Sequence, residues 1–222
     1  MHSQKRLKRL GIAVAILVAL WLLSSAVVTW RLTRRSRPPF AEPAAKITWA
    51  AVEDHRLATA DGQKIGAWLA RGAPDRGCVL LLHGNGASRT SMAGVMRLLV
   101  AEGLTVISIS LRSHGDSTGE LNDFGFGARH EVVEAVRFLE SQFPGRPIFI
   151  VGRSLGAAAA LFAADELGDR VAGYVLEQPY NDLSSATFNR LQSHLPPPLD
   201  WVAYGGMRCV SLALLPVDLK EI

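Results

Sequence analysis

Four short apolar runs constrain the fold of this chain more than any other feature. They are CVLLL (78–82), LTVISISL (104–111), PIFIV (147–151) and VAGYVLEQ (171–178). The first of them is a continuous apolar run, as expected for a strand that is buried on both faces of a sheet. Residues 88–102, 128–143 and 155–167, which lie between the runs, carry apolar side chains at helical spacing. The pattern predicts an α/β fold in which a mainly parallel sheet has helices on both faces.

A serine stands at the turn between the third run and the helix that follows it. The segment Gly152-Arg153-Ser154-Leu155-Gly156 fits G-x-S-x-G, a pattern that places a nucleophilic serine on a strained turn. Gly152 and Gly156 remove side chains that would collide across this bend. The start of the helix adds free N–H groups and a positive dipole end beside the hydroxyl. We therefore predict that Ser154 is a nucleophile; the alternative is a serine that only caps a helix.

A glycine-rich loop, HGNG, directly follows the first run. An enzyme that transfers acyl groups must stabilise an oxyanion, and two backbone N–H groups commonly do so. We expect the N–H groups of Asn85 and Leu155 to form this oxyanion hole, with Gly84 and Gly86 letting the backbone come close to the reacting carbon. His83 is expected to support the loop through hydrogen bonds rather than to act as a base.

Residues 56–181 resemble the α/β-hydrolase superfamily, especially membrane-anchored serine hydrolases related to serine aminopeptidases and monoglyceride lipases. Four segments carry the resemblance, in this order: ATADGQKIGAWLA, VLLLHGNGASR, SISLRSHGDSTGE and IFIVGRSLGAAAAL. The resemblance implies hydrolysis of an ester, thioester or amide in a small-molecule or peptide substrate. The acyl group would pass through Ser154, and neither a cofactor nor a metal would be needed.

One of these segments, SISLRSHGDSTGE, departs from the D-x-R-G-x-G-x-S loop of the family. Ser110 stands where an aspartate is usual, and Ser113 stands where a glycine is usual. This loop normally shapes the pocket, so we expect His114 and Asp116 to line or support it rather than to exchange protons.

The catalytic acid and histidine of this family both follow the nucleophile in the chain. No position after Ser154 matches either residue, which predicts a fold truncated at its C-terminus. His194, the sole histidine after Ser154, is expected to be a solvated residue of a cap. Asp182 lies where some hydrolases carry an early acid, but an acid without its imidazole has nothing to orient. The strand at 171–178 would then form an open sheet edge, available to a partner chain, and we expect reduced stability.

An uncharged apolar stretch occupies residues 10–30, after a basic tail at residues 1–9. A helix of this length spans about 30 Å, the thickness of the hydrocarbon layer of a membrane. Trp21 lies in the middle of the stretch, and Trp30 lies at its far edge. We expect a single-pass membrane helix with the catalytic domain outside the cytoplasm, although the flanking charges hardly decide the orientation. A cleavable signal peptide ending near Ser24 and Ala26 is the alternative.

The remaining boundaries follow from composition. We expect a proline-containing linker at 31–45, a hydrolase core at 46–181 and a cap-like region without a clear period at 182–222. Eight of the 24 Lys and Arg residues, and none of the 20 Asp and Glu residues, precede residue 38. The rest of the chain is therefore acidic, which disfavours nucleic-acid binding. Cys78 and Cys209 are not spaced as a metal site or a disulfide framework would require, and Cys78 is expected to be buried.

Two functions remain open from these residues. One is a membrane-anchored serine hydrolase whose acid and base come from a partner chain or from sequence that this chain lacks. The other is a membrane-anchored binding or scaffold protein that keeps the fold without its chemistry.

Overall fold

The computed structural model describes residues 2–180 and 182–215. These residues fall into two compact units. One unit comprises residues 33–180 and contains the sheet; the other comprises residues 2–32 and 182–215 and is helical.

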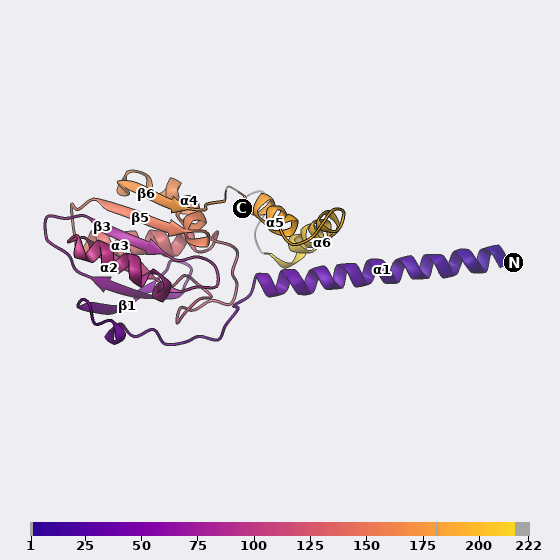
Figure 1. Cartoon of the computed structure of the whole chain (residues 1–222), viewed down its shortest axis with the longest axis horizontal. Helices are drawn as coiled ribbons and strands as arrows, with labels where there is room; N and C mark the ends of the chain where they lie inside the picture. Colours follow the sequence, from indigo (N-terminus) through magenta and orange to yellow (C-terminus); the bar gives the residue numbers. More distant parts are fainter. Residues whose placement is uncertain (1, 181, 216–222) are drawn as a thin grey trace. The chain divides into compact units, whose positions relative to one another are not determined.

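The sheet has six strands among the described residues, in the order β1-β2-β4-β3-β5-β6 (Figure 1). They are β1 (Val52–Ala58), β2 (Lys64–Ala70), β3 (Cys78–Leu82), β4 (Thr105–Ile109), β5 (Ile148–Arg153) and β6 (Gly173–Glu177). Strands β4, β3, β5 and β6 are parallel, whereas β1 and β2 form an antiparallel hairpin. The turn of this hairpin places Gly62 at a φ of 86°, a value that glycine adopts readily. The predicted α/β fold with a mainly parallel sheet is confirmed.

Helices cover both faces of the sheet (Figure 1). On one face lie α3 (Arg129–Gln142) and α4 (Leu155–Leu167), which share a core cluster with the sheet. On the other face lies α2 (Ala93–Ala101), with its own cluster. The helix predicted from residue 88 begins as a short 3-10 turn, Arg89–Met92, before α2.

Strand β3 shows why the run at 78–82 contains no polar residue. All of its side chains are buried. Leu80 and Leu82 pack in the cluster of α3 and α4, whereas Val79 and Leu81 pack in the cluster of α2. Because successive side chains of a strand point to opposite faces, a strand with helices on both sides must be apolar at every position.

The segment at 33–47, which we call the strap, packs on the core although most of it was expected to be a linker. Arg35 donates hydrogen bonds to the carbonyl oxygens of Ser117 and Gly119. Farther along the strap, the indole N–H of Trp68 donates to the carbonyl oxygen of Glu42 at 2.8 Å. These contacts fix the strap against β2 and against the loop after β4.

A buried ion cluster joins the strap to the core. The Arg89 side chain is 2% exposed, and its Nη1 lies 3.0 Å from Oε2 of Glu42 and 2.6 Å from Oδ1 of Asp116. The hydroxyl of Ser110 donates to the same Glu42 oxygen at 2.7 Å. The guanidinium also lies 5.2 Å from the Trp68 ring. Arg89 thus has two carboxylate partners, as a buried cation requires.

The helical unit contains α1 (His2–Leu32), α5 (Leu183–Gln192) and α6 (Leu199–Leu214). Helix α1 includes both the apolar stretch and the basic tail. Helices α5 and α6 occupy the region in which no clear period was found in the sequence. Helix α6 packs on α1: the indole N–H of Trp21 donates to the carbonyl oxygen of Val202 at 3.0 Å, and a Cβ at Gly206 would meet Ser25. Residues 216–222 of the expected cap-like region lie outside the described residues.

We predict that Glu42→Gln lowers the free energy of unfolding of the core by about 3 kcal/mol, because the buried Arg89 loses one of its two charged partners. Chemical denaturation followed by circular dichroism measures this change. Glu120→Gln is the matched control, since Glu120 is 73% exposed where it pairs with Arg35 and should change stability by less than about 1 kcal/mol. Equal effects of the two substitutions would contradict the structural role of the cluster.

Candidate active site

Ser154 lies between the last residue of β5 and the first residue of α4. Its φ is 48° and its ψ is −109°, a strained conformation for a residue with a side chain. Its N–H donates to the carbonyl oxygen of Glu177 in β6 at 2.8 Å, and its carbonyl oxygen accepts from the N–H of Ala158 at 2.9 Å. Strand and helix thus hold the bend from both sides, and the Ser154 side of the turn remains partly exposed.

Two glycines make this bend possible. A Cβ atom at Gly152 would lie 2.8 Å from the nitrogen of Ala157, across the turn. A Cβ atom at Gly156 would lie 2.6 Å from Cβ and 2.7 Å from the carbonyl carbon of Leu82, the last residue of β3. Both separations are shorter than non-bonded atoms tolerate. The missing side chains therefore let α4 start directly against β5 and β3.

The loop after β3 reaches the bend through Gly84. A Cβ atom at this position would lie 3.8 Å from the Cβ of Ser154 and 3.6 Å from the carbonyl oxygen of Arg153. Gly86 has a φ of 71°, which turns the loop. The structure therefore brings the HGNG loop and the serine together.

The predicted oxyanion donors belong to the loop and to the helix that meet at Ser154. Asn85 follows Gly84 in the loop, and Leu155 is the first residue of α4, where amides have no acceptor within the helix. Within residues 2–180 and 182–215, neither of these N–H groups donates a backbone hydrogen bond. Both are thus available to a ligand, whereas the N–H of Gly86 donates to Nε2 of His114 at 3.1 Å.

His83 is buried and uses both of its ring nitrogens. Nδ1 donates to the carbonyl oxygen of Gly84 at 2.8 Å, and Nε2 accepts from the N–H of Leu111 at 2.9 Å. Burial lowers the pKa of His83 to about 3, and the neighbouring His114 adds to the effect. A neutral ring without a free nitrogen supports the loop and has no capacity to accept the proton of a serine.

His114 and Asp116 also have partners of their own. Nδ1 of His114 donates to the carbonyl oxygen of Arg112 at 2.8 Å, and burial lowers the pKa of this histidine. Burial alone would raise the pKa of Asp116, but the hydrogen bonds and charges of Arg89 and Arg56 outweigh it and hold the pKa below its usual value. Both residues brace the loop after β4.

The other two candidates lie outside the unit that contains Ser154. His194 is exposed, and its Nδ1 lies 2.9 Å from the carbonyl oxygen of Arg190. Asp182 caps the N-terminus of α5 and accepts a hydrogen bond from the N–H of Ser185.

Two residues that the sequence did not single out support the site. Arg89 closes the buried cluster beneath the loop after β4, and Asn122 donates a hydrogen bond from Nδ2 to Oδ1 of Asn85 at 2.8 Å. An arginine that ends the segment HGNGASR, or an asparagine with no motif around it, gives no signal of burial. Among the described residues, no group of three or more His, Cys, Asp or Glu side chains is arranged to hold a metal ion.

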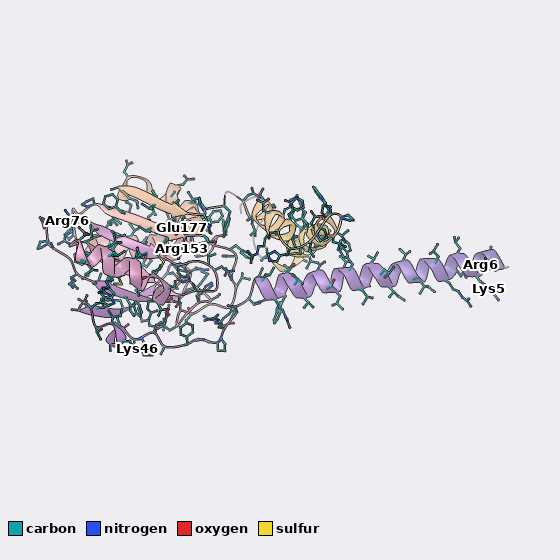
Figure 2. The ribbon with its side chains drawn as sticks, viewed as in Figure 1. Lys5, Arg6, Lys46, Arg76, Arg153 and Glu177 are labelled. Carbon is teal, nitrogen blue, oxygen red and sulfur yellow. The ribbon has the colours of Figure 1, made fainter. Side chains whose placement is uncertain are left out.

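Charged groups flank the serine on its sheet side. Nε of Arg153 donates to Oε2 of Glu177 at 2.9 Å, and the two residues are paired in the register of β5 and β6 (Figure 2). Both side chains are about half exposed. This pair marks the carboxyl end of the sheet, where open α/β sheets bind their ligands.

Comparison with known proteins identifies the family. Residues 77–205 match the family described as alpha/beta hydrolase fold. The chain belongs to this family. Human monoglyceride lipase is 32% identical over 143 residues, which cover 61% of this chain and 46% of that protein. An uncharacterized membrane protein of Saccharomyces cerevisiae is 27% identical over 125 residues, 56% of this chain and 44% of that protein.

The solved structures agree with this assignment. An esterase from Pyrococcus furiosus superposes with a TM-score of 0.60 and 25% identity, over 74% of this chain and 67% of the esterase. The predicted resemblance to α/β-hydrolases related to monoglyceride lipases is thus confirmed. This hydrolase-family chain spans less than half the length of the human and yeast relatives.

We predict that Gly156→Ala destabilises the core by about 2 kcal/mol, because the new methyl group overlaps the backbone of Leu82. The matched control is Gly94→Ala in α2, where a Cβ atom would meet nothing within 4 Å. Alanine is the better helix former by about 1 kcal/mol, so this control should be neutral or stabilising. Urea unfolding of both variants measures the difference, and a stable Gly156→Ala variant would refute the close contact between α4 and β3.

Proposed function

We propose that this chain acts as a membrane-anchored serine hydrolase on an ester, thioester or amide of a small-molecule or peptide substrate. One observation carries the proposal: Ser154 lies on a strained bend next to the HGNG loop, and within the described residues the N–H groups of Asn85 and Leu155 donate no backbone hydrogen bond. The family match and the lipase and esterase among the relatives support the same reaction class.

In this reaction the oxygen of Ser154 forms a bond to the carbonyl carbon of the substrate, and the carbonyl oxygen takes up negative charge. The N–H groups of Asn85 and Leu155 donate hydrogen bonds to that oxygen. The alcohol, thiol or amine then leaves with a proton, and water hydrolyses the acyl-enzyme. One such donor typically contributes about 10²–10³-fold to the rate, so the two amides account for a substantial part of the catalysis.

The proton of the serine requires a base, and the described residues do not supply one at Ser154. A base missing from such a triad costs on the order of 10⁶-fold in turnover. We propose that groups from outside the described residues complete the site beside β6. This strand is the edge of the described sheet, with Val175 64% exposed and Tyr174 37% exposed. A strand from a partner chain that pairs with β6 would end next to Glu177, whose carbonyl oxygen binds the N–H of Ser154.

A binding or scaffold protein without turnover is the alternative function. It is favoured by the hydrogen bonds of His83, the first residue of the HGNG loop, and of His114, which binds that loop. These bonds give both histidines structural roles. The two functions differ in whether Ser154 reacts as a nucleophile.

We predict that a fluorophosphonate probe labels Ser154 in the full chain and that Ser154→Ala abolishes the labelling, because the probe forms its bond with an activated serine oxygen. Mass spectrometry of the labelled peptide identifies the site. Ser141→Ala is the control, since Ser141 is an exposed serine whose hydroxyl donates to the carbonyl oxygen of Phe138 in its own helix. Absence of labelling at high probe concentration would favour the binding protein instead.

We also propose that α1 anchors the protein in a membrane. Residues 4–32 form a helix long and apolar enough to cross one. Its most apolar 18-residue window has a mean hydropathy of 2.5, and 6% of that window is buried. In a membrane, the exposed apolar side chains of this helix contact lipid rather than water. The yeast relative, which is described as a membrane protein, supports the proposal.

We predict that the full chain stays in the membrane pellet after alkaline carbonate extraction. Leu17→Arg combined with Leu20→Arg should release much of it, because each charge in the middle of a membrane helix costs about 3 kcal/mol of insertion energy. Leu7→Arg is the control, since Leu7 lies in the basic tail outside the uncharged stretch. Retention of the double variant would argue against a membrane span at this helix.

A further inference from the structure

Asn122 is a buried polar residue in the loop between β4 and α3. It is 6% exposed and makes three hydrogen bonds. Its N–H donates to the carbonyl oxygen of Thr33 at 2.8 Å. Its Nδ2 donates to Oδ1 of Asn85 at 2.8 Å, and its Oδ1 accepts from the N–H of Phe124 at 3.2 Å. Asn122 therefore links two segments: its backbone N–H binds Thr33, the first residue after α1, and its side chain binds the tip of the HGNG loop.

One backbone hydrogen bond closes the turn at the loop tip, from the N–H of Ala87 to the carbonyl oxygen of Gly84 at 3.2 Å. Asn85 is exposed, and Gly86 adopts a positive φ. The N–H of Asn85 donates no backbone hydrogen bond within the described residues. Two side chains also hold the tip: Asn122 binds the Asn85 side chain, and Nε2 of His114 accepts from the N–H of Gly86.

The direction of each hydrogen bond shows which group Asn122 leaves free. It binds the side-chain oxygen of Asn85 and forms no hydrogen bond with the main-chain N–H of that residue. Since Nδ1 of His114 donates to the carbonyl oxygen of Arg112, Nε2 of that ring is an acceptor. It accepts from the N–H of Gly86 at 3.1 Å and also lies 3.3 Å from Oδ1 of Asn85, and neither contact uses the main-chain N–H of Asn85. The side chain of Asn85 and the N–H of Gly86 are thus held by hydrogen bonds, whereas the main-chain N–H of Asn85 stays available.

We propose that Asn122 is a positioning residue that aims the N–H of Asn85 at the oxyanion. The proposal rests on the serine hydrolase function proposed above. An oxyanion donor is effective only within about 2.7–3.1 Å of the position that the developing charge will occupy. A loop tip that swings freely loses this geometry, whereas a tip held by Asn122 keeps it before the substrate arrives.

The hydrogen bond to Thr33 extends this support to the strap. Thr33 directly follows the last residue of α1, and Arg35 binds the carbonyl oxygens of Ser117 and Gly119 in the segment just before Asn122. The start of the strap is therefore part of the framework that holds the oxyanion loop. The strap therefore supports the loop in addition to connecting α1 with the core.

A double-mutant cycle tests the link. Asn85→Ala keeps the backbone N–H that we propose as the donor and removes only the side chain that Asn122 binds. We expect Asn85→Ala and Asn122→Ala each to slow the labelling of Ser154 by a fluorophosphonate about tenfold. The double variant should be no slower than either single variant, because both substitutions break the same hydrogen bond.

The labelling is measured on the full chain over a range of probe concentrations, which separates the rate of bond formation from probe binding. The rate should fall while the binding constant stays unchanged. Asn122→Asp is a near-isosteric second variant that keeps the acceptor for Phe124 and loses the donor to Asn85, and it should behave like Asn122→Ala. Asn189→Ala, an exposed asparagine on α5, should label at the wild-type rate.

Unchanged labelling of Asn122→Ala and Asn122→Asp would overturn the proposal, as would effects that multiply in the double variant. Hydrogen exchange provides a readout that does not depend on activity: residues 83–88 should exchange faster in Asn122→Ala than in the wild type, and equal exchange would also overturn the proposal. If the wild type is not labelled, the hydrolase function fails, and the exchange measurement still decides whether Asn122 holds the loop.

Discussion

The close approach of α4 to the end of β3 is the contact on which the site depends. Gly156 lies so near Leu82 that a single methyl group would overlap its backbone. This contact places the start of a helix, with its free N–H groups, directly beside the loop that leaves β3. A larger residue would push α4 away and carry Ser154 out of reach of the Asn85 amide. The strained φ of Ser154 is tolerated because the packing on both sides of the turn holds the backbone in this conformation.

The charged groups beneath the site have a structural role. Arg89, Glu42 and Asp116 form a buried cluster that ties the strap to the core, and His83 is held neutral by burial. In the reaction that we propose, the chemistry is carried out by backbone amides and one hydroxyl. Backbone amides do not titrate, so an oxyanion site built from them depends on loop position rather than on pH. This dependence is what gives Asn122 its importance, since it binds the loop without occupying the amide.

The sequence predicted the parts of this protein that depend on local pattern. The four parallel strands and the helix that starts at Leu155 were predicted from the sequence, because periodicity and glycine placement act over a few residues. The extents of other elements were less well defined. The helix predicted from residue 88 starts with a 3-10 turn, and the region after residue 182 contains two helices whose apolar pattern was too irregular to reveal them.

By itself, the sequence determined the α/β architecture, the position of Ser154 on a strand–turn–helix corner and the apolar stretch suited to a membrane. Only the tertiary structure decided that part of the expected linker packs on the core through Glu42, that Trp21 binds the backbone of α6, and that Asn122 reaches Asn85. The physical reason is the distance along the chain. Hydrogen bonds between residues tens of positions apart leave no periodic trace in the sequence, because each partner is compatible with many local contexts until the fold brings the two together.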